Sequence, residues 1–256
     1  MARRKEFDDA VAVIEASALV KTFAGRPAVD GVSLAVGPGE VVGFLGLNGA
    51  GKSTTMRLLV GALLPDRGTA RICGHDMAAD RRAGQACLGY LPEAAAGFGH
   101  LTAREFLAFC GESRGLWGDR LGAAIARAAD AARLGPALDE AMRSLSKGWR
   151  QRAWFAQAIL HDPPVLILDE PTDGLDPMQK DHVRDLIRDI AEDKAIVIST
   201  HVLEEAEEVC DRAVIIADGR IIADAPCAEL TDAGGRLAGA FRRIVERDAA
   251  PEGPPP

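Results

Sequence analysis

At residues 46–54 the chain reads Gly46-Leu47-Asn48-Gly49-Ala50-Gly51-Lys52-Ser53-Thr54, directly after the apolar run Val41–Leu45. The glycines let the backbone curl with its N–H groups inward, so several amides and the N-terminus of the next helix converge on one anion. In the pattern G-x-x-x-x-G-K-[ST], the lysine reaches the β- and γ-phosphates of a nucleotide and the next hydroxyl binds Mg²⁺. We therefore predict that all nine residues hold the nucleotide, that Lys52 also serves in catalysis, and that Ser53 is a metal ligand.

The composition is that of an ordinary globular protein. The chain has 256 residues, of which 48% are hydrophobic, and a formal net charge of −8. This acidic balance argues against nucleic acid as the main partner, because a phosphate backbone is met by a basic surface. The five cysteines form no C-x-x-C pair, which favours reduced thiols in a cytosolic protein. We expect no export signal and no membrane-spanning helix, because no signal-peptide stretch follows the N-terminus and the apolar runs are strand-sized.

The pattern of apolar residues predicts an α/β fold with three parts. Alternating apolar residues over 11–36 predict an N-terminal antiparallel β subdomain, with further short strands near residues 69–73 and 87–91. Helical spacing over 101–143, opened by the capping-box pattern Thr102 to Glu105, predicts a helical insert. Strand-like 165–168 and 195–199, separated by an amphipathic helix, predict a mainly parallel sheet. The phosphate loop and the mainly parallel sheet predict a P-loop NTPase core, to which the antiparallel β subdomain and the helical insert are added.

A second acidic motif follows the apolar strand 165–168. Asp169 and Glu170 stand at its carboxyl end. In P-loop enzymes the first acid of such a pair assists Mg²⁺, and a neighbouring acid can polarise the attacking water. We predict that Asp169 is a metal ligand and that Glu170 is catalytic.

Two further segments give the chain a family resemblance. Pro171-Thr172-Asp173-Gly174-Leu175-Asp176 follows the acidic pair, and Leu145-Ser146-Lys147-Gly148-Trp149 stands before it. With these motifs in order, the chain resembles the nucleotide-binding subunit of an ATP-binding-cassette (ABC) transporter. The resemblance implies an ABC-type ATPase domain over residues 7–232, with the helical insert at about 94–148. Residues 233–256 would be a short C-terminal segment, and its four prolines predict a loose tail from residue 248.

The resemblance also implies roles for residues outside the phosphate loop. Ser146 and Gly148 would face the γ-phosphate of ATP bound to a second copy, and Asp176 would lie in the loop that links the two sites. His201, after the strand at 195–199, would be a catalytic residue that contacts the γ-phosphate. Phe23 would stack on adenine, although an aromatic residue at this position could equally belong to the core.

The chain departs from the family pattern at three positions. Glu93 stands where most members carry a glutamine that touches Mg²⁺, and a carboxylate can still be a metal ligand there. Lys147 and Trp149 replace the usual signature residues, as they do in a branch of bacterial subunits that pair with separately encoded export-type permeases. The remaining histidines match no functional position and are interpreted as surface or turn residues, at positions 75, 100, 161 and 182.

The function implied is that of an ATPase subunit with ATP and Mg²⁺ as cofactors. Two copies, or one copy and a similar subunit, would close on ATP and drive a transmembrane permease from the cytoplasmic face of the membrane, without direct contact with nucleic acid. The alternative is a soluble ABC-type ATPase that acts on nucleic acid or ribosomes, but such proteins usually carry two cassettes or a long coiled-coil insert. A small-molecule kinase would leave the signature segment and His201 without a role.

Overall fold

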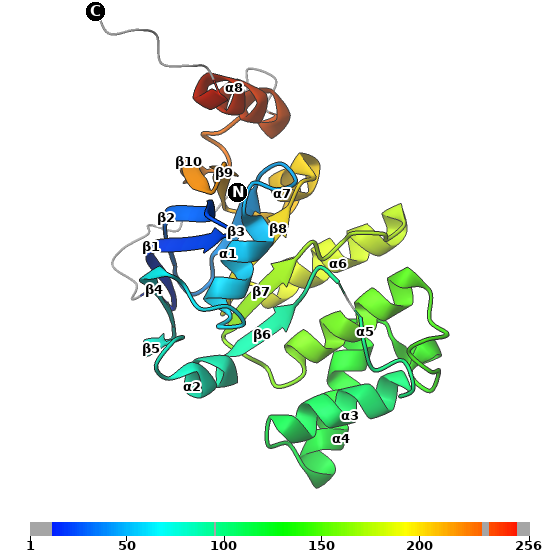
Figure 1. Ribbon diagram of the computed structural model, residues 1–256. Coiled ribbons are helices and arrows are strands. Elements are labelled where there is room, and N and C mark those ends of the chain that lie inside the picture. Colours follow the sequence, from blue (N-terminus) through cyan, green and yellow to red (C-terminus); the bar gives the residue numbers. More distant parts are fainter. Residues whose placement is uncertain (1–11, 95, 232–235, 250–256) are drawn as a thin grey trace, which may run out of the picture.

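The computed structural model describes residues 12–94, 96–231 and 236–249 (Figure 1). Within these residues the strands form two sheets. The smaller sheet is antiparallel, with the order β2-β1-β4-β5, which confirms the predicted N-terminal antiparallel subdomain. Its first strands bury alternate apolar residues such as Ile14 and Val32, as expected for a sheet that packs on the core with one face. Its strands are β1 (Ile14–Phe23), β2 (Arg26–Val36), β4 (Arg67–Ile72) and β5 (His75–Asp76).

The larger sheet carries the phosphate loop, and its order is β10-β9-β3-β8-β7-β6. All its pairs are parallel except β10 with β9, so the predicted mainly parallel sheet is confirmed. Strands β9 and β10 were not predicted from the sequence, although Asp218-Gly219 between them is a hairpin signal. The strands are β3 (Val41–Leu45), β6 (Leu88–Leu91), β7 (Val165–Asp169), β8 (Ala195–Thr200), β9 (Arg212–Ala217) and β10 (Arg220–Pro226).

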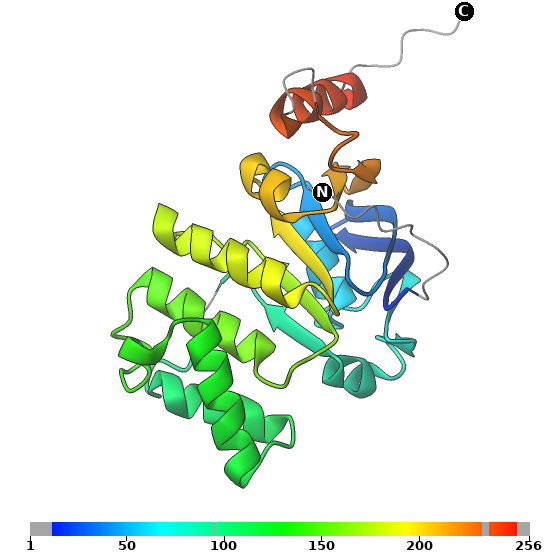
Figure 2. The ribbon, with the colours of Figure 1, turned by 180° about the vertical axis from the view of Figure 1, so that it is seen from behind.

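Helices cover this sheet on both faces. The strands β3, β7 and β8 are apolar and send alternate side chains to opposite faces, so both faces have to be covered, and all three strands are buried throughout. On one face α1 (Lys52–Leu59) packs Met56 into a core with Phe44 and Ile167. The other face packs against three helices, of which Figure 2 shows α6 and α7 in front of the sheet. These helices are α5 (Lys147–Ile159), α6 (Pro177–Ile190) and α7 (Leu203–Val209).

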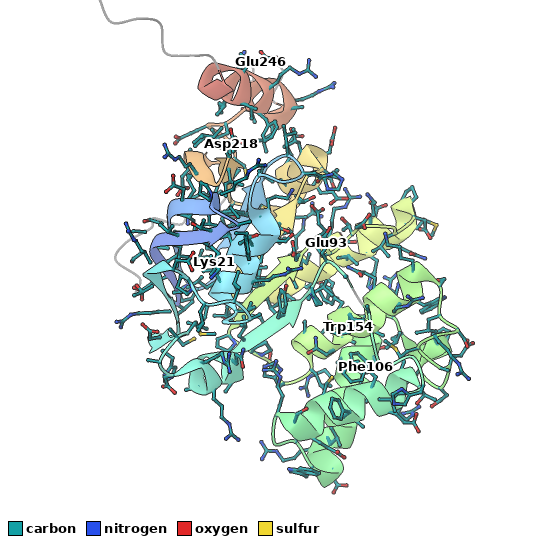
Figure 3. All side chains as sticks on the ribbon, viewed as in Figure 1. Lys21, Glu93, Phe106, Trp154, Asp218 and Glu246 are labelled. Atoms are coloured by element: carbon teal, nitrogen blue, oxygen red, sulfur yellow. The ribbon has the colours of Figure 1, made fainter. Side chains whose placement is uncertain are left out.

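The helical insert has a hydrophobic core of its own, which includes part of α5. Phe106 and Trp154 meet there with ring centroids 5.0 Å apart (Figure 3). The predicted capping box is present, since the Thr102 N–H donates to Glu105 Oε2 and the Glu105 N–H donates to Thr102 Oγ1. The insert comprises α3 (Ala103–Ser113), α4 (Gly118–Ala131) and the 3₁₀ turn η1 (Gly135–Ala137), and α5 follows it and packs against it. The short helix α2 (Arg81–Ala86) precedes β6.

The C-terminal part contains a helix that the sequence analysis did not predict. This helix, α8 (Leu237–Ala249), packs on α7 and β10, and Leu237 and Ala240 are buried. The predicted start of the loose tail at residue 248 is therefore wrong, because residues 248 and 249 belong to α8. Residues 7–11, 95, 232–235 and 250–256 of the predicted segments lie outside the described residues. Among the described helices, none is long and apolar enough to span a membrane.

Candidate functional site

The phosphate loop leaves β3 and leads into α1. Gly51 is the N-cap residue of α1 with a φ of 108°, and a Cβ there would lie 2.4 Å from the carbonyl oxygen of Ala28. Only glycine fits both conditions. The first turn of α1 holds no acidic side chain, so its free amides and the positive end of the helix dipole are available to an anion.

Lys52 joins the loop to the acidic motif. Its side chain is buried, and Nζ donates to the carbonyl oxygens of Gly46 at 2.9 Å and Leu47 at 3.4 Å. The same nitrogen lies 3.7 Å from Glu170 Oε1. A cation and a carboxylate predicted from separate motifs therefore meet in one place.

The three predicted metal ligands also converge. Ser53 Oγ lies 3.2 Å from Glu93 Oε2 and 3.3 Å from Asp169 Oδ1. Glu93 stands on the segment that leads from β6 to the helical insert (Figure 3). Asp169 is buried, and burial raises the pKa of its carboxyl group, while hydrogen bonds from Ser199 and Ser53 act in the opposite direction.

This set of oxygens fits Mg²⁺. Carboxylate and hydroxyl oxygens are the donors that Mg²⁺ prefers, and the ion usually takes one or two carboxylates and completes an octahedron with water and phosphate oxygens. Within the described part of the chain, no three His, Cys, Asp or Glu side chains form a metal cluster. Asp169 and Ser53 would hold the ion with Glu93 beside them, and the ion would neutralise charge on the phosphates.

Glu170 and His201 form the centre of the candidate site. Glu170 is 7% exposed, and its Oε2 lies 2.9 Å from His201 Nδ1. The side chain of His201 is 50% exposed. Glu170 has a φ of 51°, in the left-handed region, and its N–H donates to the carbonyl oxygen of Ser199 at 3.0 Å. A strained backbone held by its surroundings is typical of functional positions. This carboxylate can accept a proton from water, while His201 reaches toward solvent.

Phe23 lies apart from the acidic centre, at the end of β1. Its side chain is 49% exposed, and Lys21 Nζ stands 5.9 Å from the ring centroid. Phe23 is outside the hydrophobic clusters of the described residues, so it is not a core residue. Stacking on adenine stays a prediction.

The signature residues contact a different part of the molecule. Ser146 is the N-cap residue of α5, and its Oγ accepts from the Trp149 N–H. Lys147 Nζ lies 2.7 Å from Asp173 Oδ2. A Cβ on Gly148 would stand 2.6 Å from Gln179 Oε1. These contacts are made to α5 itself, to α6 and to the loop before α6. Asp176 caps α6 by accepting from the Gln179 N–H.

Three polar residues of the site were missed by the sequence analysis. Ser199 Oγ donates to Asp169 Oδ1, because parallel pairing sets Ser199 opposite Asp169. Gln151 Nε2 donates to the carbonyl oxygens of Glu170 and Pro171, at 3.3 and 3.4 Å. Glu205 on α7 is the third, because its Oε2 accepts from the hydroxyl of Thr172 in the loop after Glu170. The only sequence signal for Ser199 was its place at the end of an apolar strand, and Gln151 and Glu205 stand on helices with no local pattern that marks them.

Replacing Glu93 tests the metal site. If Glu93 acts as an oxygen ligand, Glu93→Ala should lower ATP turnover at limiting Mg²⁺ by roughly 10–100-fold, the range seen when groups that support a metal ion are lost. Glu93→Gln keeps an oxygen at the same reach and should stay within about threefold of the original chain. Steady-state phosphate release over a Mg²⁺ titration measures both. Equal turnover in all three proteins would show that the residue is peripheral.

Comparison with known proteins identifies relatives of this chain. Residues 29–173 match the family described as ABC transporter. The chain is 40% identical over 223 residues to the Nod factor export ATP-binding protein I of Paraburkholderia xenovorans (strain LB400), covering 85% of this chain and 72% of that protein. It is 39% identical over 223 residues to the daunorubicin/doxorubicin resistance ATP-binding protein DrrA of Streptomyces peucetius, covering 87% and 68%.

Solved structures share the fold. One described as the ATP binding subunit of an ABC transporter superposes with a TM-score of 0.82 at 29% identity, over 91% of this chain and 99% of that one. A dimeric bacterial ABC transporter cassette gives a TM-score of 0.78 at 23% identity, over 83% and 98%. Both likenesses confirm that the chain has the fold of an ABC transporter ATPase cassette.

Proposed function

Because this chain belongs to the ABC transporter family and is an ATP-binding subunit that hydrolyses ATP, we propose that two copies close on two ATP molecules and thereby drive a separately encoded membrane permease. Export is the direction we propose, because the relatives include a Nod factor export protein and a drug-resistance protein. The proposal places the chain on the inner face of the membrane, where ATP is available.

The placement of α1 and α5 on opposite faces of the large sheet supports the proposed dimer. Lys52 begins α1 on one face of the large sheet, whereas Ser146 is the N-cap residue of α5, which packs on the opposite face and against the helical insert. Both views show α1 and α5 on different sides of the sheet (Figures 1 and 2). Ser146 and Gly148 would therefore meet the γ-phosphate bound to a second copy, so ATP binding contributes free energy to association.

The chemistry that we propose uses the groups of the acidic centre. Lys52 and the loop amides hold the β- and γ-phosphates, and Mg²⁺ beside Asp169 and Ser53 supplies charge neutralisation when bound. A water oxygen attacks the γ-phosphorus, and Glu170 accepts the proton of that water. The bond between the bridging oxygen and the γ-phosphorus breaks, and ADP leaves with its electron pair. His201, held by Glu170 at 2.9 Å, contacts the γ-phosphate.

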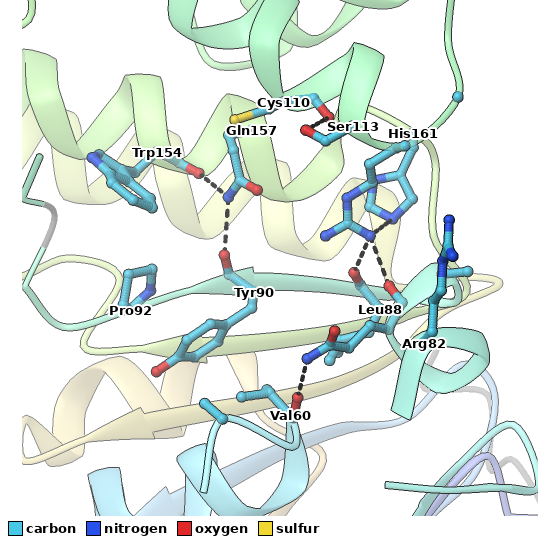
Figure 4. A pocket seen from close by; sticks show the side chains of 15 residues that line it. Val60, Arg82, Leu88, Tyr90, Pro92, Cys110, Ser113, Trp154, Gln157 and His161 are labelled. Atoms are coloured by element: carbon cyan, nitrogen blue, oxygen red, sulfur yellow. Dashed lines mark hydrogen bonds between the residues drawn. The ribbon is translucent and has the colours of Figure 1, made fainter. Parts of the chain in front are cut away.

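A groove beside Glu93 is the surface we propose for the permease. It has a volume of about 760 Å³ between the α2–β6 segment and helices α3 and α5 (Figure 4). Tyr90 and Pro92 line one side, and Pro92 directly precedes Glu93. A permease segment docked there would contact the residues next to Glu93, a candidate metal ligand. Changes at the nucleotide site could thereby be transmitted to the permease.

Arg114 and His161 line this groove and are held by hydrogen bonds. Arg114 Nη1 donates to the carbonyl oxygens of Gln85 and Leu88, at 2.7 and 2.9 Å, and lies 2.8 Å from His161 Nε2. Burial, followed by the charge of Arg114, lowers the pKa of His161 to about 4. The neutral imidazole can therefore accept the hydrogen bond from the guanidinium at physiological pH.

Ser146→Arg tests the shared site. The substitution sets a bulky side chain where the γ-phosphate of the second copy needs a close hydroxyl group, so it should prevent the ATP-dependent dimer without touching Lys52. We expect dimers in a Glu170→Gln background with MgATP, and monomers once Ser146→Arg is added, by size-exclusion chromatography with light scattering. Ser17→Arg, at an exposed serine of β1, is the matched control. A dimer that forms without nucleotide, or that survives Ser146→Arg, contradicts the shared-site mechanism.

A further inference from the structure

A buried carboxylate in α7 joins three separate segments of the chain. Glu205 is 8% exposed. Its Oε2 accepts from the Thr172 hydroxyl at 2.5 Å and from the Thr200 hydroxyl at 3.4 Å, and its Oε1 accepts from Lys180 Nζ at 2.8 Å. Thr172 lies in the loop after β7, Thr200 ends β8, and Lys180 stands one turn into α6. A buried charge needs such a full set of partners, and here they come from three elements.

Two of these partners stand beside residues of the candidate catalytic centre. Thr172 is two residues after Glu170, and Thr200 immediately precedes His201. The Thr200 hydroxyl also accepts from the Val202 N–H at 3.0 Å, which fixes the turn on both sides of His201. Glu205 therefore reaches the two segments whose relative position sets the contact between Glu170 and His201.

No local sequence pattern predicts the contact between Glu170 and His201. Glu170 and His201 each directly follow a different strand and are 31 residues apart, yet Oε2 and Nδ1 lie 2.9 Å apart. The left-handed backbone of Glu170 has to be held by its surroundings. On the side of α5, Gln151 binds the carbonyl oxygens of Glu170 and Pro171. On the side of α7, the next residue of the loop, Thr172, is held by Glu205.

We propose that Glu205 is a positioning residue for ATP hydrolysis, which keeps the loop after β7 and the turn after β8 in fixed relation so that Glu170 and His201 act together. It makes no contact with the phosphate loop among the hydrogen bonds of the described residues, so it acts through these segments. The inference rests on the proposed role of Glu170 as the base. A misplacement of about 1 Å at a reacting group lowers a rate by roughly 10²-fold.

Glu205→Ala and Thr172→Val test this role. Each should lower kcat by roughly 10–100-fold, while the Kd for MgATP, measured by calorimetry, stays within about threefold because the phosphate loop is untouched. Thr172→Val removes only a hydroxyl group and keeps the side-chain volume, so it serves if Glu205→Ala does not fold. Glu204→Ala, at an exposed neighbour on α7, should leave both values unchanged. Retention of full kcat in both Glu205→Ala and Thr172→Val overturns the proposal.

A double variant separates positioning from general weakening of the fold. If the hydrogen bond between Thr172 and Glu205 positions Glu170, adding Thr172→Val to Glu170→Gln should cause no further loss in single-turnover hydrolysis, because the group to be positioned is already inactive. A merely structural role would multiply the two losses and overturn the proposal. Near-normal hydrolysis in Glu170→Gln alone would overturn the base assignment as well, so failure of the proposed mechanism is distinguished from failure of the positioning role.

Discussion

Glu170→Gln is expected to slow ATP hydrolysis by roughly 10²–10⁴-fold, the range for loss of a general base. The amide keeps the size of the side chain and can still lie against His201, but it cannot accept the proton of the attacking water. Nucleotide binding should persist, because Lys52 and the loop amides are unchanged. Single-turnover hydrolysis and calorimetric binding of MgATP measure the two quantities separately.

Glu170→Gln should accumulate as an ATP-bound dimer, because two copies can still close on ATP but the slow hydrolysis no longer separates them. Glu192→Gln, at an exposed carboxylate after α6, is the matched control and should hydrolyse ATP normally. If Glu170→Gln hydrolyses ATP at the rate of the control, Glu170 is not the base, whatever its distance to His201.

Lys52→Ala is expected to abolish measurable hydrolysis, with a loss of roughly 10³-fold or more, as for other cations that stabilise a transferring phosphoryl group. Nucleotide binding should weaken by roughly 10–100-fold, which corresponds to one lost hydrogen bond to a charged group. The amide cradle remains, so some binding should survive. Phosphate release should be measured for the chain alone and with its permease in lipid.

Lys194→Ala provides the control for loss of a lysine. Lys194 Nζ lies 2.6 Å from Asp162 Oδ1. Lys194 directly precedes β8, which runs parallel to β3, so it lies at the edge of the sheet opposite the phosphate loop. Its removal should therefore leave turnover near normal. Turnover near that of the control in Lys52→Ala would refute the phosphate-loop assignment.

Local patterns allowed much of the fold and part of the site to be predicted from sequence. The phosphate loop, the capping box of Thr102 and the buried strands depend on neighbouring residues, through glycine φ angles, helix-end hydrogen bonds and apolar periodicity. The same holds for the acidic pair Asp169 and Glu170, which follows a buried strand. The β9–β10 hairpin also had a local signal at Asp218-Gly219, which went unused.

What could not be read from the sequence depends on strand order and on contacts between distant segments. Local periodicity says which residues of a strand are buried, but not which strand lies beside it. The order β3-β8-β7 brings Ser199 against Asp169 and His201 against Glu170. The packing of α7 then brings Glu205 to three donors, and α8 forms in the C-terminal segment, for which no helix was predicted. The chain's motifs therefore predicted the groups that we propose bind and hydrolyse ATP, whereas the tertiary structure decided which side chains contact them, because a buried polar side chain is stabilised only by partners that the fold brings to it.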